Sequence, residues 1–347
     1  MRIADKLKSI RFTPSTRSHS RNRRTASSVI AVLGLVLVAL LFLGWYWSRT
    51  PPLFDVAAEA RQRAGKDALV TGYVTSATLA RVVETLLEKP GGYLSNDVAP
   101  PSVFLDNMPN WEYGVLTQSR DLARALRNDF ARSRSQSMED ADLVQVEPNL
   151  NANNDRWLLP SSENEYSEAL TALDSYLKRL NDANSQDAQF FARADNLADW
   201  LSTISKRLGS LSQRLSTSAG QYRFNTDLGG DAAGRRPAAA PSEIYVRTTW
   251  TNVDDIFFEA RGSTWALIHF LRAVEVDFQD VLKDKNAVVS LRQIIRELEA
   301  TQRPIGSPII LNGSGYGVFA NHSLTIAAYI ARANAALIDL RNLLSQG

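Results

Sequence analysis

The hydrophobic positions of this chain first form one unbroken run. From Val29 to Trp47 the sequence VIAVLGLVLVALLFLGWYW has nineteen consecutive residues without a charge, a proline or a strongly polar side chain. A helix rises about 1.5 Å per residue, so this run nearly spans the ~30 Å hydrocarbon core of a bilayer. We therefore expect a transmembrane helix at 29–47, which separates a tail, 1–28, from a domain, 48–347.

Beyond residue 48 the apolar residues recur at alternating spacings of three and four, which is typical of helices packed at shallow angles. This spacing predicts helices near 79–86, 111–131, 166–180, 190–215, 257–281, 288–298 and 326–344. Arg207 and Arg214 flank one side of the 190–215 pattern and serines flank the other. The complementary charges of a homodimeric coiled coil are missing, which favours a bundle within one chain.

The expected fold class is mainly α: an elongated helical bundle with heptad-like seams and at most one small β-hairpin, placed at 308–319. The helices at 166–180 and 190–215 are joined by a short polar turn and should form an antiparallel pair. Loops are expected at 89–110, 132–162 and 217–242. The last is rich in Gly, Ala and Pro, so it is either a disordered insertion or a boundary between two lobes.

Charge is distributed unevenly about the apolar run. Eight of the 39 basic residues and one of the 37 acidic residues lie in 1–28, which leaves 31 basic and 36 acidic residues after the run. Basic residues crowded beside a span stay in the cytoplasm, so the tail is expected inside and the domain outside. The basic tail also suits anionic lipid headgroups. The mildly acidic domain makes a nucleic-acid partner unlikely.

The end of the apolar run distinguishes an anchor from a signal peptide. Trp45, Tyr46 and Trp47 suit an aromatic belt at headgroup depth. A cleaved signal has a shorter apolar core and small residues at the cut. Arg23 and Arg24 resemble the arginine pair of a twin-arginine export signal, but no neighbouring residue supports that interpretation. An uncleaved anchor is the favoured interpretation.

Motifs for known chemistry are scarce. The chain has no cysteine, which excludes disulfides, thiolate metal sites and a cysteine nucleophile. His269 lies among large apolar residues, as a hydrogen-bonded core histidine would. Gly313 to Gly317 fails the spacings of a serine-hydrolase elbow, a dinucleotide loop and a P-loop. We expect no metal and no cofactor, and no catalytic residue is assigned.

Candidate binding residues concentrate in the segment 89–114 (KPGGYLSNDVAPPSVFLDNMPNWEYG), where aromatic side chains accompany carboxylates and amides. This composition is typical of sugar- or peptide-binding loops, and equally of a loop that caps a bundle. With two residues near the Gly-rich segment 309–322, the candidates are Tyr93, Asp97, Asp106, Asn107, Asn110, Trp111, Glu112, Tyr316 and His322.

Three stretches also carry a family resemblance: KPGGYLSND (89–97), LDNMPNWEYG (105–114) and RWLLPSSENEY (156–166). Together with the basic tail and the single apolar run ending in WYW, they resemble a family of proteobacterial envelope proteins of unknown function. The resemblance covers nearly the whole chain. It implies a bacterial inner-membrane protein with a periplasmic domain, and it implies no activity, cofactor or catalytic residue.

Three functions remain open at this level. The first is a non-catalytic scaffold or adaptor of the cell envelope, which offers its bundle surface and the 89–114 segment to a protein partner. The second is a ligand-binding or sensory module, which requires Trp111 and Asp106 in a concave site. The third is a cell-wall hydrolase that uses Asp97, Asp106, Glu112 or His322, and it requires two carboxyl groups within about 10 Å across a cleft.

Overall fold

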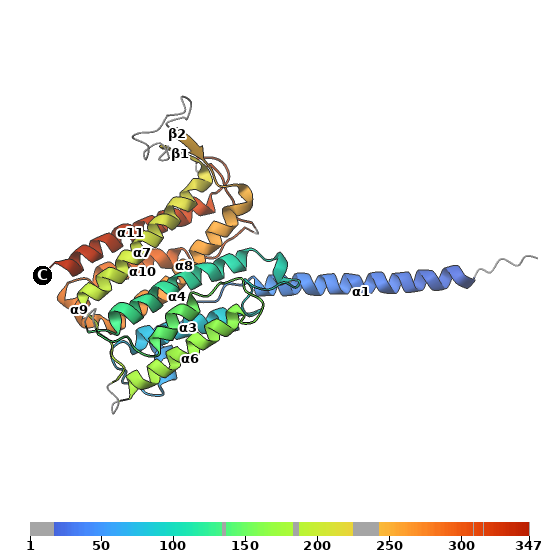
Figure 1. Cartoon of the computed structure of the whole chain (residues 1–347). Helices are drawn as coiled ribbons and strands as arrows, with labels where there is room; N and C mark the ends of the chain where they lie inside the picture. Colours follow the sequence, from blue (N-terminus) through green and yellow to red (C-terminus); the bar gives the residue numbers. More distant parts are fainter. Residues whose placement is uncertain are drawn as a thin grey trace, which may run out of the picture. The chain divides into compact units, whose positions relative to one another are not determined.

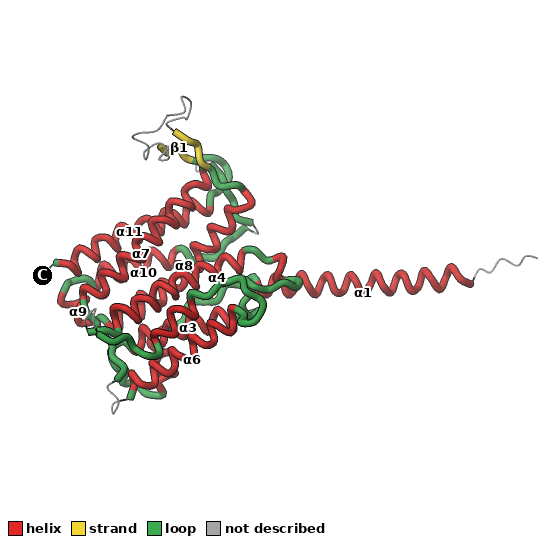
Figure 2. The backbone as a smooth tube through the Cα atoms, in the orientation of Figure 1, coloured by secondary structure: helices red, strands yellow, loops and turns green. Residues whose placement is uncertain are grey.

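The computed structural model describes residues 17–133, 137–182, 187–224, 243–307, 309–314 and 316–346 (Figures 1 and 2). Over these residues the chain is mainly α-helical, as the sequence predicts. The elements in chain order are α1 (Arg17–Trp47), α2 (Val56–Ala64), α3 (Tyr73–Glu88), α4 (Asn107–Ala125), α5 (Leu143–Leu150), α6 (Ser162–Asn181), α7 (Ala194–Ser216), β1 (Gln221–Phe224), β2 (Glu243–Val246), α8 (Val253–Asp277), α9 (Gln279–Asp284), α10 (Val288–Ala300) and α11 (His322–Ser345).

The chain divides into two compact units, Met1–Tyr46 and Trp47–Gly347. The first contains nearly all of α1. Within α1, Ser27–Trp47 is the stretch of the described residues that is long and apolar enough to cross a membrane, and its side chains are almost all exposed. A signal sequence near an N-terminus has the same character. Residues 1–16 of the expected basic tail lie outside the described residues.

The second unit is a helical bundle built around α4 and α8. These helices run in the same direction, because Asn110 bonds to Asp255 near their starts and the rings of Phe130 and Phe278 meet 5.3 Å apart just beyond their ends. The helices approach so closely at Gly114 that an added Cβ would lie 2.1 Å from the carbonyl oxygen of Glu259.

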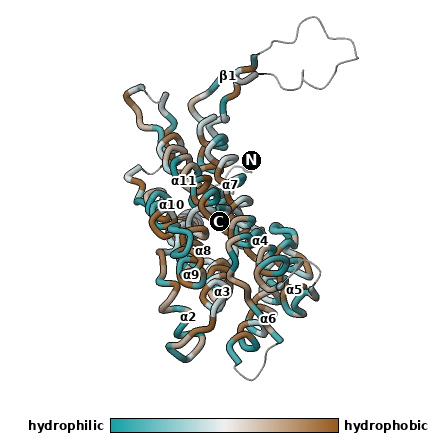
Figure 3. The backbone as a smooth tube through the Cα atoms, turned by 90° about the vertical axis from the view of Figure 1, so that its left-hand side faces the viewer, coloured by the Kyte–Doolittle hydropathy of each residue, from teal (hydrophilic) through white to brown (hydrophobic). Residues whose placement is uncertain are grey.

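Two groups of helices pack against this central pair (Figure 3). On one side α7 lies against α11, and α10 packs on both α11 and α8. α7 and α11 are antiparallel, since Ser205 bonds to Asn334 at 2.8 Å and Ser212 donates to the carbonyl of Ala327 at 3.3 Å. On the other side α3 packs on α8 and α6, and α5 packs on α6 and α4.

The heptad-like spacing correctly identified the buried faces of the long helices. In α7 the buried seam consists of Leu197, Leu201, Ile204, Leu208, Leu211 and Leu215. With 23 residues, α7 is about 35 Å long, shorter than expected because it begins at Ala194 rather than at Phe190.

The pairing of helices was predicted less well. α6 and α7 do not pack against each other, because α6 faces α3 and α5 whereas α7 faces α11. The expected loop at 132–162 contains α5, a short helix with Pro148 inside it. The small sheet is formed by β1 and β2, and not by the described residues of 308–319. In that segment Asn312 and Asn321 make an isolated bridge. Residues 225–242, which make up most of the expected loop at 217–242, lie outside the described residues.

Candidate functional site

The carboxylate of Glu112, one of the predicted binding residues, is completely buried at the start of α4. It lies 2.5 Å from the ammonium group of Lys89, which is also buried. It accepts hydrogen bonds from the backbone N–H groups of Leu94 and Ser95 at 2.9 and 2.8 Å and from the Ser95 hydroxyl at 2.5 Å. Burial raises the pKa of Glu112, whereas these donors favour the ionised form. Glu112 therefore fixes the chain reversal after α3.

The neighbouring candidates also serve the fold. Trp111 is completely buried, with its ring centroid 5.2 Å from that of Trp265 on α8. Asp106 caps α4 by accepting from the N–H of Asn107 at 2.8 Å. The amide of Asn110 donates to Asp255 at 2.7 Å. Trp111 is thus part of the core and does not line a concave site.

The remaining candidates lie apart from one another. The Tyr93 hydroxyl donates to the carbonyl of Asn154 at 3.0 Å. Asp97 is exposed and lines a cavity of about 390 Å³ that Asp106, Glu112 and His322 do not line. His322 begins α11, and its Nδ1 accepts from the N–H of Leu311 at 3.1 Å. Tyr316 is fully exposed. The nine residues do not form a common site.

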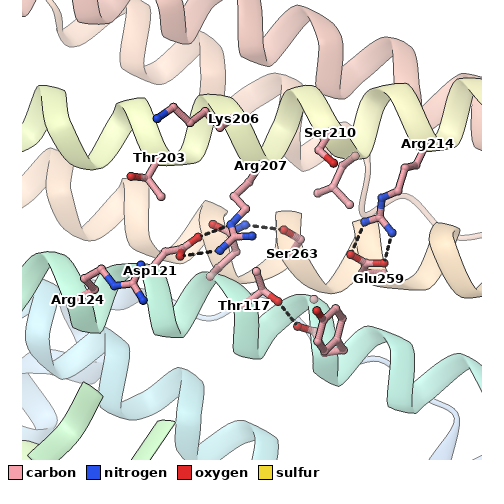
Figure 4. Close-up of a pocket in the computed structure, with 14 residues that line it drawn as sticks. Thr117, Asp121, Arg124, Thr203, Lys206, Arg207, Ser210, Arg214, Glu259 and Ser263 are labelled. Carbon is pink, nitrogen blue, oxygen red and sulfur yellow. Dashed lines mark hydrogen bonds and ion pairs between the residues drawn. The ribbon is translucent and has the colours of Figure 1, made fainter. Parts of the chain in front are cut away.

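A groove between α4, α7 and α8 encloses a cavity of about 510 Å³ (Figure 4). Two ion pairs cross it. Arg207 of α7 makes a two-pronged contact with Asp121 of α4, with N···O distances of 2.8 and 3.0 Å. Arg214, two turns further along α7, contacts both carboxylate oxygens of Glu259 on α8. These carboxylates raise the pKa values of both arginines, chiefly through the hydrogen bonds they accept.

The groove has a polar floor and a net positive lining. Gln118 of α4 donates to the hydroxyl of Ser263 on α8 at 2.7 Å, and both residues are buried. Arg124 and Lys206 add two more cations at one end of the groove. Arg124 pairs with Glu147 at 3.0 Å, whereas Lys206 makes no ion pair within the described part of the chain. The lining therefore carries four basic and two acidic side chains, which suits an anionic group near Lys206.

The signal for this groove in the sequence is weak. Arg207 and Arg214 flank the α7 seam seven residues apart, but their partners lie on helices more than forty residues away in the chain. Among the described residues, no group of three or more His, Asp or Glu side chains could hold a metal ion.

Residues 20–347 match the model of a family described as an uncharacterized protein conserved in bacteria (DUF2333). The chain belongs to the DUF2333 family. The DUF2333 match includes the apolar run, the 89–114 segment and the helical bundle, so the resemblance to a bacterial family of unknown function is confirmed. No curated protein and no solved structure matches the chain.

Proposed function

We propose that the protein is a non-catalytic adaptor of the bacterial cell envelope, anchored in the inner membrane by α1, with its helical domain in the periplasm. The anchor is supported by the length and hydropathy of Ser27–Trp47 and by the aromatic residues at its end. The orientation is supported by the excess of basic residues in 1–28. The adaptor role rests on an exposed aromatic surface at one end of the bundle.

The observation that carries the proposal is a group of exposed aromatic and aliphatic side chains at one end of the bundle, which we call the aromatic end. It lies where α7 ends and α11 begins, on β1, β2, the short turn 250–252 that precedes α8, and the segments 309–314 and 316–319. Its members are Tyr222, Tyr245, Trp250, Ile309, Tyr316, Val318 and Phe319, of which Tyr316 is 106% and Val318 98% exposed. Aromatic residues are enriched in protein interfaces and in their energetic hot spots.

The backbone under the aromatic end is held in place by hydrogen bonds. Asn321 is buried, and its amide donates to the carbonyl of Gly313 at 2.7 Å and to the side chain of Asn312 at 3.0 Å. Its side-chain oxygen caps α11 through the N–H of Leu324 at 2.9 Å and accepts from Ser218 at 3.3 Å. One side chain therefore joins the end of α7, the 309–314 segment and the start of α11.

The two strands present a matched aromatic pair. Tyr222 of β1 lies opposite Tyr245 of β2, with ring centroids 5.1 Å apart. Gly220 precedes β1 with a φ of +82°, and an added Cβ there would clash with the ring of Tyr245. These rings are thus held by the local fold although they face solvent. Ordered, exposed aromatic side chains lose little conformational entropy on binding, which favours a protein partner.

The proposal is tested by the size of the particle that contains the full chain when it is extracted from its own membrane in mild detergent. We expect a complex heavier than one copy of the 38.4 kDa chain, and a return to the single chain when Trp250, Tyr316 and Phe319 are changed to serine. The matched control is Val289→Ser, an exposed apolar position on α10. An unchanged particle in the triple variant would contradict the adaptor role of this surface.

A second candidate function, an anion-binding module, is favoured by the groove between α4, α7 and α8. Its support is the placement of Lys206 on α7 and Arg124 on α4 at the same end of a groove with a buried polar floor. If this candidate is right, inorganic phosphate or pyrophosphate raises the unfolding temperature of the full chain, and K206Q with R124Q abolishes the shift. K283Q, on α9 away from the groove, should leave the shift unchanged. An identical shift in the groove variant would reject this function.

A further inference from the structure

Two loops of the domain expose large apolar side chains although neither belongs to the aromatic end. One loop runs from 97 to 104 and the other from 157 to 160. Their exposed members are Val98, Val103, Phe104, Trp157, Leu158 and Leu159, of which Phe104 is 78% and Leu159 88% exposed. Six such side chains on two adjoining loops need an explanation, because soluble surfaces rarely gather them.

The two loops meet around Trp47. This residue ends the apolar run and is the first residue of the second unit. The 390 Å³ cavity is lined by Trp47 together with Val98 of the first loop and Trp157 of the second. Gly91 approaches the Trp47 ring so closely that an added Cβ would lie 2.8 Å from it. Trp47 is therefore seated in the domain beside both loops.

Polar side chains hold the loops in this form. The amide of Asn96 donates to the carbonyl of Arg156 at 2.9 Å and to the carboxylate of Glu163 at 2.6 Å, which ties the first loop to the second. The hydroxyl of Ser102 donates to the carbonyl of Ala99 at 2.6 Å. Hydrogen bonds thus fix the backbone of both loops while the apolar side chains remain exposed to solvent.

From this arrangement we infer that the loops 97–104 and 157–160 dock into the headgroup region of the leaflet in which the apolar run ends. The inference rests on the proposed anchor: Tyr46 and Trp47 then lie at headgroup depth, and side chains around Trp47 reach the same depth. Trp, Phe and Leu are the side chains that enter this layer, where binding scales with buried apolar area.

Charge near the loops favours zwitterionic over anionic lipid. Asp97 and Glu163 line the cavity around Trp47, Asp155 and Arg156 precede the second loop, and Arg49 follows Trp47 by two residues, so acidic side chains outnumber basic ones by three to two. An anionic surface would repel these carboxylates, whereas apolar insertion needs no charge complement. The predicted ligand is therefore the interfacial layer of a phosphatidylcholine or phosphatidylethanolamine bilayer.

The chain has no cysteine, so single cysteines can carry an environment-sensitive fluorophore. We place them at Phe104, Leu158 and, as the matched control, Val289, which is 78% exposed at the start of α10. Val289 lies at the other end of the domain: α10 joins the last turns of α8 through Arg292 and Glu275, and Asp277 there contacts Thr75 at the start of α3. α3 then spans about 24 Å before Gly91 and Trp47.

The labelled full chain is reconstituted in phosphatidylcholine vesicles with and without lipids that carry a nitroxide quencher. We expect quenching at 104 and 158 to exceed that at 289 several-fold, with the reverse order for a water-soluble quencher. Equal behaviour of all three labels would overturn the inference. A fourth label at Leu37 reports the anchor alone, so quenching at 37 without quenching at 104 and 158 rejects the docking and leaves the anchor standing.

Discussion

The backbone N–H of Phe54 donates to Nε2 of His269 at 3.1 Å, across 215 positions of the sequence. The Phe54 ring also stacks on the imidazole, with centroids 3.9 Å apart. Nδ1 of His269 lies 2.8 Å from the carbonyl oxygen of Trp265, so Nδ1 carries the proton and Nε2 accepts. The segment that follows the apolar run is therefore tied directly to the central helix of the bundle, and His269 is a core residue, as its sequence neighbours predicted.

This contact predicts a loss of stability in acid. Burial lowers the pKa of His269 to about 3 from 6.5. Below pH 6.5 the unfolded chain binds a proton that the folded chain does not, so the contribution of His269 is complete above pH 6.5 and is lost as the pH falls. Between pH 7 and pH 5 the loss is about 2 kcal/mol.

Urea unfolding of the wild type and of H269Q at both pH values measures this term. Other groups also respond to pH: burial raises the pKa of Asp277 to about 6, which favours folding as the pH falls. Because both proteins contain Asp277, the difference between them isolates His269. The wild type should lose about 2 kcal/mol more than H269Q. Equal losses would show that the imidazole is protonated in the folded domain.

The contact between α4 and α8 predicts a strong dependence on two glycines. An added Cβ would lie 2.1 Å from a carbonyl oxygen at Gly114 and 1.9 Å from one at Gly262. Neither backbone can yield without separating the helices, so G114A and G262A should each lower the free energy of unfolding by about 3 kcal/mol. The matched control is G209A in α7, where the nearest atom is 3.7 Å away. There alanine should stabilise by up to about 1 kcal/mol.

The buried pair of Lys89 and Glu112 predicts a large effect from a single neutral substitution. E112Q leaves the Lys89 ammonium buried without its counter-ion, which costs about 3–5 kcal/mol of folding free energy. D195N breaks the exposed pair with Arg193 and should change stability by less than about 1 kcal/mol. If E112Q unfolds at the same urea concentration as the wild type, the stabilising role of the Lys89–Glu112 pair is contradicted.

The long helices could be predicted from the sequence because the apolar spacing of each helix lies within one short stretch of the chain. Leu197 to Leu215 repeat at the helical period whatever they face, so α7 was found. Its packing partner α11 was not predicted, because the apolar spacing of one helix does not show which other helix packs against it. The sequence pattern did not predict α5, because this helix is short and contains Pro148.

The candidate residues show a similar limit. Aromatics beside carboxylates suggested a binding loop, yet Trp111 packs on Trp265 and Glu112 pairs with Lys89. Burial of this kind depends on α8 and on the end of α3, which no local pattern reveals. Tyr316 alone among these candidates lies on the aromatic end.

Site-specific photo-crosslinking in living cells tests the adaptor proposal most directly. A photoreactive amino acid replaces Tyr316 or Trp250 on the aromatic end, and Val289 on α10 in the control. We predict the same adduct with one other envelope protein from Tyr316 and from Trp250, and none from Val289. The adaptor proposal would be contradicted by the absence of adducts at the aromatic end, by adducts with a second copy of the chain only, or by equal labelling from Val289.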